Sequence, residues 1–148
     1  ATRKKLSKSS KYIFYDMGVR RIAAREGVQL IPDRKGKLFE HLVGNEILKW
    51  IRSRNIDSRL YYWRDLDGPE VDWVIEYEDQ LLPIEVKYAD KIKPTHADHL
   101  RLFMKEYSEA KSALLVNASS LIYEFEKKIK VVGLKNLTAY LDSYFKIQ

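Results

Sequence analysis

The sequence contains no cysteine. Disulfide bridges and thiolate zinc sites are therefore excluded, and this composition is typical of a reducing cytoplasm, where we expect the protein to act. No apolar run approaches the roughly 18 residues that a membrane-spanning helix needs, and the first residues do not resemble a signal peptide. We therefore expect no association with a membrane.

Several catalytic patterns are also missing. The phosphate-binding loop G-x-x-x-x-G-K-[ST] is absent, because Gly36-Lys37 is followed by Leu38 and lacks the earlier glycine. There is no G-x-S-x-G motif and no cysteine nucleophile. The three histidines lack the spacing of a zinc site. ATP hydrolysis by a phosphate-binding loop and acyl transfer by a nucleophile elbow are therefore excluded for this chain.

The composition that remains is that of one folded domain. The 148 residues are 45% apolar and 12% aromatic, which is enough for one core and too little for two comfortable ones. We predict a single domain over residues 1–148, with residues 1–10 as a basic, flexible N-terminus. Because the sequence begins with Ala, we expect it to be excised from a longer protein.

The net charge of +6 is unevenly distributed. Residues 1–64 carry 16 Lys and Arg against 6 Asp and Glu, whereas residues 65–148 carry 11 against 15. A basic half can follow a nucleic-acid backbone, but an acidic cluster repels phosphate unless a metal ion lies there. The bland alternative is an ordinary solvated surface. The basic residues that we expect to contact nucleic acid are Arg20, Arg21, Arg25, Lys35, Lys37 and Arg64.

Hydrophobic periodicity predicts an α/β fold. Strands are predicted at 12–15, 60–64, 71–77, 81–87, 113–116 and 129–132. Helices are predicted over 17–26, over 36–54, for about 15 residues from Pro94, and after Gly133. A strand, a helix and a further strand imply a parallel crossover. The expected architecture is a sandwich in which a small mixed β-sheet is flanked by helices on both faces.

The predicted strand 71–77 alternates in character. Val71, Trp73 and Ile75 fall on one face, and Asp72 falls on the other. A hairpin through Glu78 and Asp79 then pairs this strand with 81–87. We expect the hairpin to bring Asp72 to the neighbouring strand.

Glu85 and Lys87 share a face of the predicted strand 81–87. The hairpin places Asp72 beside them. Two carboxylates inside apolar sequence are costly unless a positive charge compensates them. A divalent metal ion would compensate them, and a phosphate substrate would suit both the metal and the lysine.

Two acids interrupt the apolar stripe of helix 36–54. Glu46 lies near the middle of the stripe, between Val43 and Trp50, and Glu40 lies one turn before Val43. A buried helix face usually excludes glutamate. Each glutamate is either paired with an arginine or directed into a site.

The order Glu40, Asp72 and Glu85-x-Lys87, carried on a helix and then on two successive strands, resembles the PD-(D/E)xK nuclease superfamily. With its flanking segments, the sequence also resembles the C-terminal domain of unknown function that follows the ATPase module in a family of prokaryotic AAA+ ATPases. Those segments read KYIFYDMGV (11–19), GKLFEHLVGNEI (36–47), YYWRDLDGPEVDWVI (61–75) and LPIEVKYA (82–89).

The resemblance implies a restriction-endonuclease-like sandwich with a metal-dependent phosphodiesterase site. In it, Lys87 would orient a water and stabilise negative charge, and Glu40 would orient Lys87 or join a second metal site. The implied ligands of Mg²⁺ or Mn²⁺ are Asp72, Glu85, the backbone carbonyl of Val86 and, as an accessory ligand, Glu70.

These features give two expectations for function. The first is a Mg²⁺-dependent DNA endonuclease domain behind an upstream ATPase module, which would assemble as a homo-oligomer through the parent protein. The second is a catalytically silent domain of the same fold that docks DNA or a partner of the ATPase, because a fold alone does not fix a function.

Overall fold

The computed structural model describes residues 32–65 and 68–147. The strand predicted at 12–15, the helix predicted at 17–26 and the candidate contacts Arg20, Arg21 and Arg25 lie outside the described residues. The prediction for residues 1–10 also lies outside them.

The described elements are three helices, with three consecutive strands between each helix and the next. The helices are α2 (Pro32–Arg54), α3 (Asp98–Glu106) and α4 (Leu137–Phe145), with short 3-10 turns η1 (Pro94–Ala97) and η2 (Leu134–Asn136) before the last two. The strands are β1 (Ser58–Arg64), β2 (Glu70–Tyr77), β3 (Gln80–Val86), β4 (Ala113–Asn117), β5 (Ile122–Glu126) and β6 (Ile129–Gly133).

The strands form one six-stranded mixed sheet in the order β1-β2-β3-β4-β6-β5. The first three are antiparallel neighbours, β4 pairs parallel with β3 and with β6, and β5 is antiparallel to β6 at the edge. The predicted hairpin at Glu78 and Asp79 is confirmed, because Tyr77 pairs with Gln80. The parallel crossover through α3 is confirmed as well.

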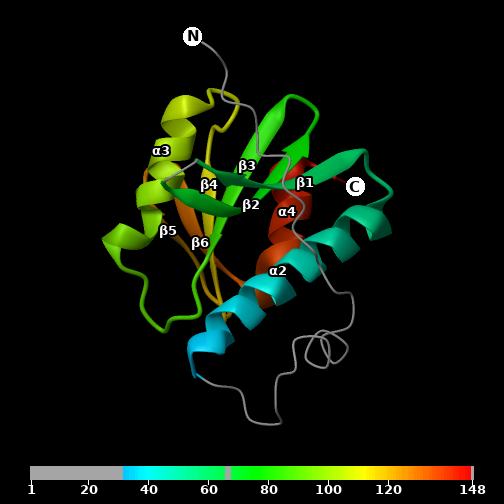
Figure 1. The fold of residues 1–148 in the computed structure, drawn as a ribbon. Helices are drawn as coiled ribbons and strands as arrows, with labels where there is room; N and C mark the ends of the chain where they lie inside the picture. Colours follow the sequence, from blue (N-terminus) through cyan, green and yellow to red (C-terminus); the bar gives the residue numbers. More distant parts are fainter. Residues whose placement is uncertain (1–31, 66–67, 148) are drawn as a thin grey trace.

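Helices cover both faces of the sheet, as the sequence predicted (Figure 1). On one face, α2 and α4 pack on a core that includes Trp50, Trp73 and Leu141. On the other face, α3 packs on a core that includes Trp63 and Phe103. The molecule is therefore a three-layer mixed α/β sandwich.

The sequence pattern missed strand β5. No strand was predicted between 113–116 and 129–132, whereas Ile122–Glu126 forms this edge strand. Glu124 and Tyr123 are both exposed, and Phe125 is only half-buried, because an edge strand has little to pack against. Such a strand lacks the apolar signal on which periodicity depends.

Strand β2 corrects the predicted alternation. Tyr61 pairs with Val74 and Trp63 pairs with Val71, so that Tyr62 alone faces both Asp72 and Trp73. This extra residue is a β-bulge, which re-aims the side chains beside it. Val71 consequently belongs to the core under α3, while Trp73 belongs to the core under α2.

None of the described helices is both long enough and apolar enough to cross a lipid bilayer.

Candidate functional site

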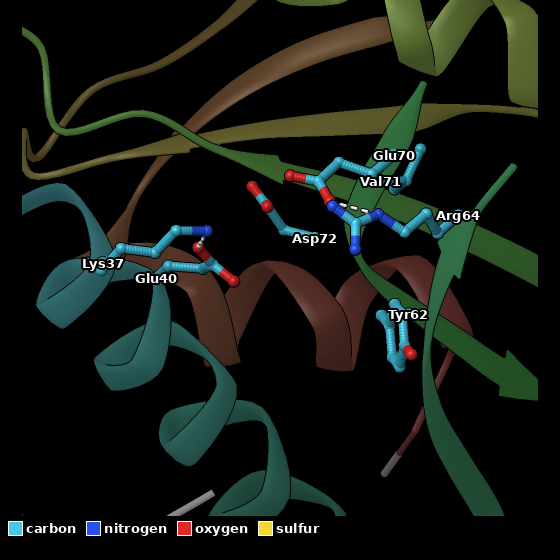
Figure 2. A pocket seen from close by; sticks show the side chains of 7 residues that line it. All are labelled: Lys37, Glu40, Tyr62, Arg64, Glu70, Val71 and Asp72. Atoms are coloured by element: carbon cyan, nitrogen blue, oxygen red, sulfur yellow. Dashed lines mark hydrogen bonds and ion pairs between the residues drawn. The ribbon is translucent and has the colours of Figure 1, made fainter. Parts of the chain in front are cut away.

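A pocket of about 270 Å³ lies where the N-terminal turns of α2 approach the start of β2. Figure 2 shows Lys37 and Glu40 reaching from the helix towards Asp72, with Arg64 and Glu70 on the opposite wall. Tyr62 and Val71 complete the lining. Five residues predicted from sequence therefore meet in this pocket, namely Lys37, Glu40, Arg64, Glu70 and Asp72.

Asp72 owes its position to the bulge and to the neighbouring strand. The backbone N–H of Val86 donates a hydrogen bond to Asp72 Oδ2 over 2.8 Å, and the side chain is largely buried. This bond fixes the carboxylate of β2 against the end of β3. Asp72 and the Glu85–Lys87 segment therefore meet at one end of the sheet, as predicted.

Glu85 is the most unusual acid of the site. Lys87 Nζ donates a hydrogen bond to Glu85 Oε1 over 2.6 Å, whereas Oε2 is buried and accepts no hydrogen bond from the described residues. Burial raises the pKa of Glu85, the ammonium of Lys87 opposes that rise, and the charges of Glu70 and Glu40 add to it. The carboxylate thus carries more negative charge than its surroundings compensate.

The backbone of Glu40 is held by the sheet. Trp73 Nε1 donates to the carbonyl oxygen of Glu40 over 3.1 Å, and Glu40 as a residue is only 7% exposed. Lys37 Nζ donates to Glu40 Oε2 over 3.0 Å. Hydrogen bonding to Glu40 raises the pKa of Lys37, and the charges of Asp72 and Glu70 contribute to the increase.

The second glutamate of the helix stripe is not part of the site. Glu46 is half-buried and pairs with Lys49, one turn further along α2. Of the two acids that interrupted the stripe, only Glu40 enters the pocket. Each of the two is paired with a lysine three residues away, Glu40 with Lys37 and Glu46 with Lys49.

Only some of the basic residues predicted to contact nucleic acid lie at the pocket. Lys37 and Arg64 line the pocket, and Arg64 Nε lies 3.3 Å from Glu70 Oε2. Lys35 is exposed on α2 and is not among the lining residues. Glu85, on β3, and Lys87, just after it, also lie outside the lining.

The donor set is small for a metal ion held by protein alone. Across residues 32–65 and 68–147, no group of three or more His, Cys, Asp and Glu side chains is arranged to hold one. Mg²⁺, however, is commonly bound by one or two carboxylates and completed by waters and substrate phosphates. Asp72, Glu85 and a backbone carbonyl fit that kind of site, and the unsatisfied Glu85 oxygen is suited to a cation.

Gly44 supports the site, and this role was not predicted from the sequence. A Cβ at this position would lie 2.4 Å from the Trp73 ring, so glycine is what lets the indole reach the helix backbone. A glycine inside an otherwise strong helix was the available signal, because it usually has a packing reason.

Two solved structures share the architecture. A chain of the half-complex from a tetradecameric assembly of Thermococcus gammatolerans McrB AAA+ hexamers with bound McrC aligns with 74% of this chain at 13% identity and a TM-score of 0.51. Protein VC1899 of Vibrio cholerae aligns with 76% at 18% identity and a TM-score of 0.53. This chain spans about a third of the length of each, 33% and 34%. At these identities the likeness concerns the fold.

No curated protein matches the sequence. A family described as a domain of unknown function, DUF4143, matches residues 35–137, which is more than half of the chain and includes most of α2, the bulge, Glu85 and Lys87. The predicted resemblance to a domain of unknown function rested on segments 11–19, 36–47, 61–75 and 82–89; the family match covers the last three of these and continues to residue 137, whereas 11–19 precedes it. The chain belongs to the DUF4143 family.

Proposed function

We propose that this chain is a metal-dependent nuclease domain that hydrolyses DNA phosphodiester bonds. The observation that carries the proposal is the buried, unsatisfied Oε2 of Glu85 beside Asp72 and Lys87. Leaving a buried anionic oxygen without a partner is costly. A divalent cation at this place would remove the cost.

Asp72 and Glu85, with the carbonyl of Val86, would hold Mg²⁺ or Mn²⁺, and Glu70 would be an accessory ligand. Bound there, the ion polarises a phosphate and lowers the pKa of a coordinated water. Lys87 is a third exposed, so that its ammonium can contact both Glu85 and a phosphate oxygen. Its positive charge would stabilise negative charge that develops on the phosphate.

Glu40 and the two cations of the pocket have supporting roles. Glu40 extends the acidic wall, and its position depends on Trp73 rather than on the metal. Lys37 and Arg64 line the pocket and can contact the phosphates on either side of the cleaved bond. Both cations are paired with acids in the structure, so that DNA or metal must displace part of that pairing.

The proposed partner within the parent protein is an ATPase module. The likeness to a chain of an AAA+ hexamer assembly supports this partner, and so does the family-level resemblance seen in the sequence. A ring-forming ATPase would bring several copies of this domain together. The domain would then act as part of a homo-oligomer.

A second candidate is a catalytically silent module that docks DNA for the ATPase. It is favoured by the ion pairs Lys37–Glu40 and Arg64–Glu70, which neutralise two of the acids without a metal. In that case the fold would supply a binding surface and the carboxylates would be structural.

Calorimetry with Mg²⁺ and Mn²⁺ separates the two candidates. The proteins compared are the wild type, Asp72→Asn and Glu85→Gln, with Glu124→Gln as a control, because Glu124 is an exposed acid on the far edge strand. Metal binding to the wild type and the control, lost in both site variants, is expected. Cleavage of labelled linear and branched DNA in the presence of metal should follow the same order.

Two further results complete the test. Lys87→Met should retain metal binding but lose cleavage, because its proposed role concerns the phosphate rather than the ion. Absence of metal binding at millimolar concentration, both with and without DNA, would reject the nuclease and leave the docking module.

A further inference from the structure

A second pocket of about 450 Å³ opens at the carboxyl ends of β3 and β4. Its walls are Tyr88, Ala89 and Asp90, which follow β3, and Ala118 and Ser119, which follow β4. These two strands are parallel neighbours. Ligands of α/β proteins commonly bind outside the carboxyl ends of parallel strands.

The β4 wall is fixed in place. The side-chain oxygen of buried Asn117 accepts hydrogen bonds from the backbone N–H and the hydroxyl of Ser119, over 3.1 and 2.7 Å. Ser119 Oγ in turn accepts from the backbone N–H of Leu121. A Cβ on Gly133 would lie only 2.0 Å from the Ser119 carbonyl oxygen, so this loop is packed directly on β6.

The β3 wall presents an aromatic ring. Tyr88 is 54% exposed, and its ring packs at 5.4 Å and 57° against Phe39 of α2. Phe39 is itself in the core. A partly exposed aromatic ring supported from below is a surface on which a base can stack.

The pocket is suited to a base rather than to a phosphate. Of its five lining residues none is cationic, and Asp90 is an anion that would repel phosphate. Carboxylate oxygens accept hydrogen bonds from the amino groups of bases, and the ring of Tyr88 offers stacking. Lys87, one residue before Tyr88, belongs to the proposed phosphate site.

We propose that this pocket takes one unpaired base of the DNA strand, stacked on Tyr88 and hydrogen-bonded to Asp90, while the adjoining phosphate lies at Lys87. The inference rests on the proposed function and narrows its substrate to DNA that has unpaired nucleotides. A base in a continuous duplex is stacked on its neighbours, and it can enter the pocket only after it leaves the helix.

The test measures DNA binding in EDTA, so that it is independent of metal and cleavage. Fluorescence anisotropy would compare a labelled single-stranded oligonucleotide, the same sequence as duplex, and a free deoxynucleoside monophosphate as competitor. The variants are Tyr88→Ala, Tyr88→Phe and Asp90→Asn. Tyr123→Ala is the matched control, because Tyr123 is exposed on the far edge strand β5.

Loss of the ring should weaken single-strand binding by about tenfold, since stacking of one base on an aromatic side chain has an effect of that order. Tyr88→Phe and Tyr123→Ala should bind as the wild type does. Asp90→Asn should change the preference among homopolymer oligonucleotides. When an oligonucleotide that contains one 2-aminopurine binds to the wild type, the fluorescence of that base should be quenched. Binding to Tyr88→Ala should not quench it.

The inference is overturned if Tyr88→Ala weakens single strands and duplex equally, or weakens neither. It is also overturned if the free mononucleotide binds as tightly as the oligonucleotide. If Asp72→Asn loses cleavage but still quenches 2-aminopurine as the wild type does, the proposed base pocket is supported independently of the metal site. Absence of all cleavage by the wild type, with quenching intact, would reject the proposed hydrolysis alone.

Discussion

The indole of Trp73 occupies the space in which a side chain of residue 44 would stand. A Cβ on Gly44 would lie 2.4 to 2.9 Å from three atoms of the ring, and the indole N–H donates to the carbonyl of Glu40 one turn earlier. The contact joins α2 to the bulge of β2. It therefore sets the depth at which Glu40 stands beside Asp72.

Gly44→Ala should destabilise the protein by about 1–3 kcal/mol, because the added methyl must displace a buried indole ring in a packed core. Urea unfolding followed by tryptophan fluorescence measures the loss. Gly36→Ala is the matched control in the same helix. Nothing lies within 4 Å of its added Cβ, so this variant should gain about 0.4–1 kcal/mol. Equal effects of the two substitutions would contradict the role assigned to Trp73.

Glu85→Gln should stabilise the metal-free protein, whereas most substitutions in a protein core destabilise it. In metal-free buffer it should raise the free energy of unfolding by about 1–2 kcal/mol, because a neutral amide costs less to bury than a carboxylate with an unsatisfied oxygen. The amide oxygen can still accept from Lys87. Thermal unfolding in EDTA and in Mg²⁺ checks this prediction.

In Mg²⁺ the order of stability should reverse. The wild type should gain stability through metal binding, whereas Glu85→Gln should not change. A wild type that is more stable than the variant in EDTA would show that Glu85 is fully compensated within the protein, and would remove the main support for a metal.

The sequence predicted most of the fold because the buried elements have regular patterns. Helix α2, the hairpin of β2 and β3, and β4 each have an apolar face or a continuous apolar run, and each lies within a few residues of its predicted bounds. Strand β5 has no such face because it lies at the edge of the sheet. The local sequence of β5 therefore contained no apolar pattern from which a strand could be predicted.

The site was predicted by residue type and order, but its geometry was not. Strict alternation put Trp73 on the same face as Val71, whereas the bulge opposite Tyr62 separates them. A bulge depends on the register between two strands, which no single segment encodes. The pairing of Glu40 with Lys37 depends on rotamers and also has no sequence signal.

Asp142 links the two helices that share a face of the sheet. It accepts hydrogen bonds from Arg54 over 2.9 and 2.6 Å and from Trp50 Nε1 over 2.8 Å. The hydrogen bond from Arg54 is the main cause that lowers the pKa of Asp142 below its ordinary value of 3.8. Because the folded pKa is lowered, this link stabilises the protein above pH 3.8 and is lost as the pH falls through the folded value.

Asp142→Asn should therefore lower the unfolding midpoint at pH 7, and the difference from wild type should shrink progressively at pH values below 4. Asp57→Asn, at an exposed acid before β1, is the control and should leave the midpoint nearly unchanged. Thermal unfolding monitored by circular dichroism from pH 3 to pH 7 gives the comparison. An equal loss at both ends of that range would show that the charge of Asp142 is not what matters.

The ammonium of Lys37 lies among the acids of the pocket, so that in the proposed nuclease it would compete with a metal ion for their negative charge. Its ammonium lies 3.0 Å from Glu40 Oε2, and Asp72 and Glu70 add to the field that it feels. Lys37→Gln should bind Mg²⁺ roughly two- to fivefold more tightly, which is the range expected when one exposed charge is removed from an ion pair. Lys35→Gln, on the same helix but outside the pocket lining, should leave the metal affinity unchanged.

The same Lys37 variant should bind DNA more weakly, because a phosphate contact is lost. If Lys37 serves the proposed nuclease, Lys37→Gln should therefore raise the affinity for Mg²⁺, measured by calorimetry, and lower the affinity for DNA, measured by anisotropy. A loss of DNA affinity without a gain for Mg²⁺ would instead favour the docking module.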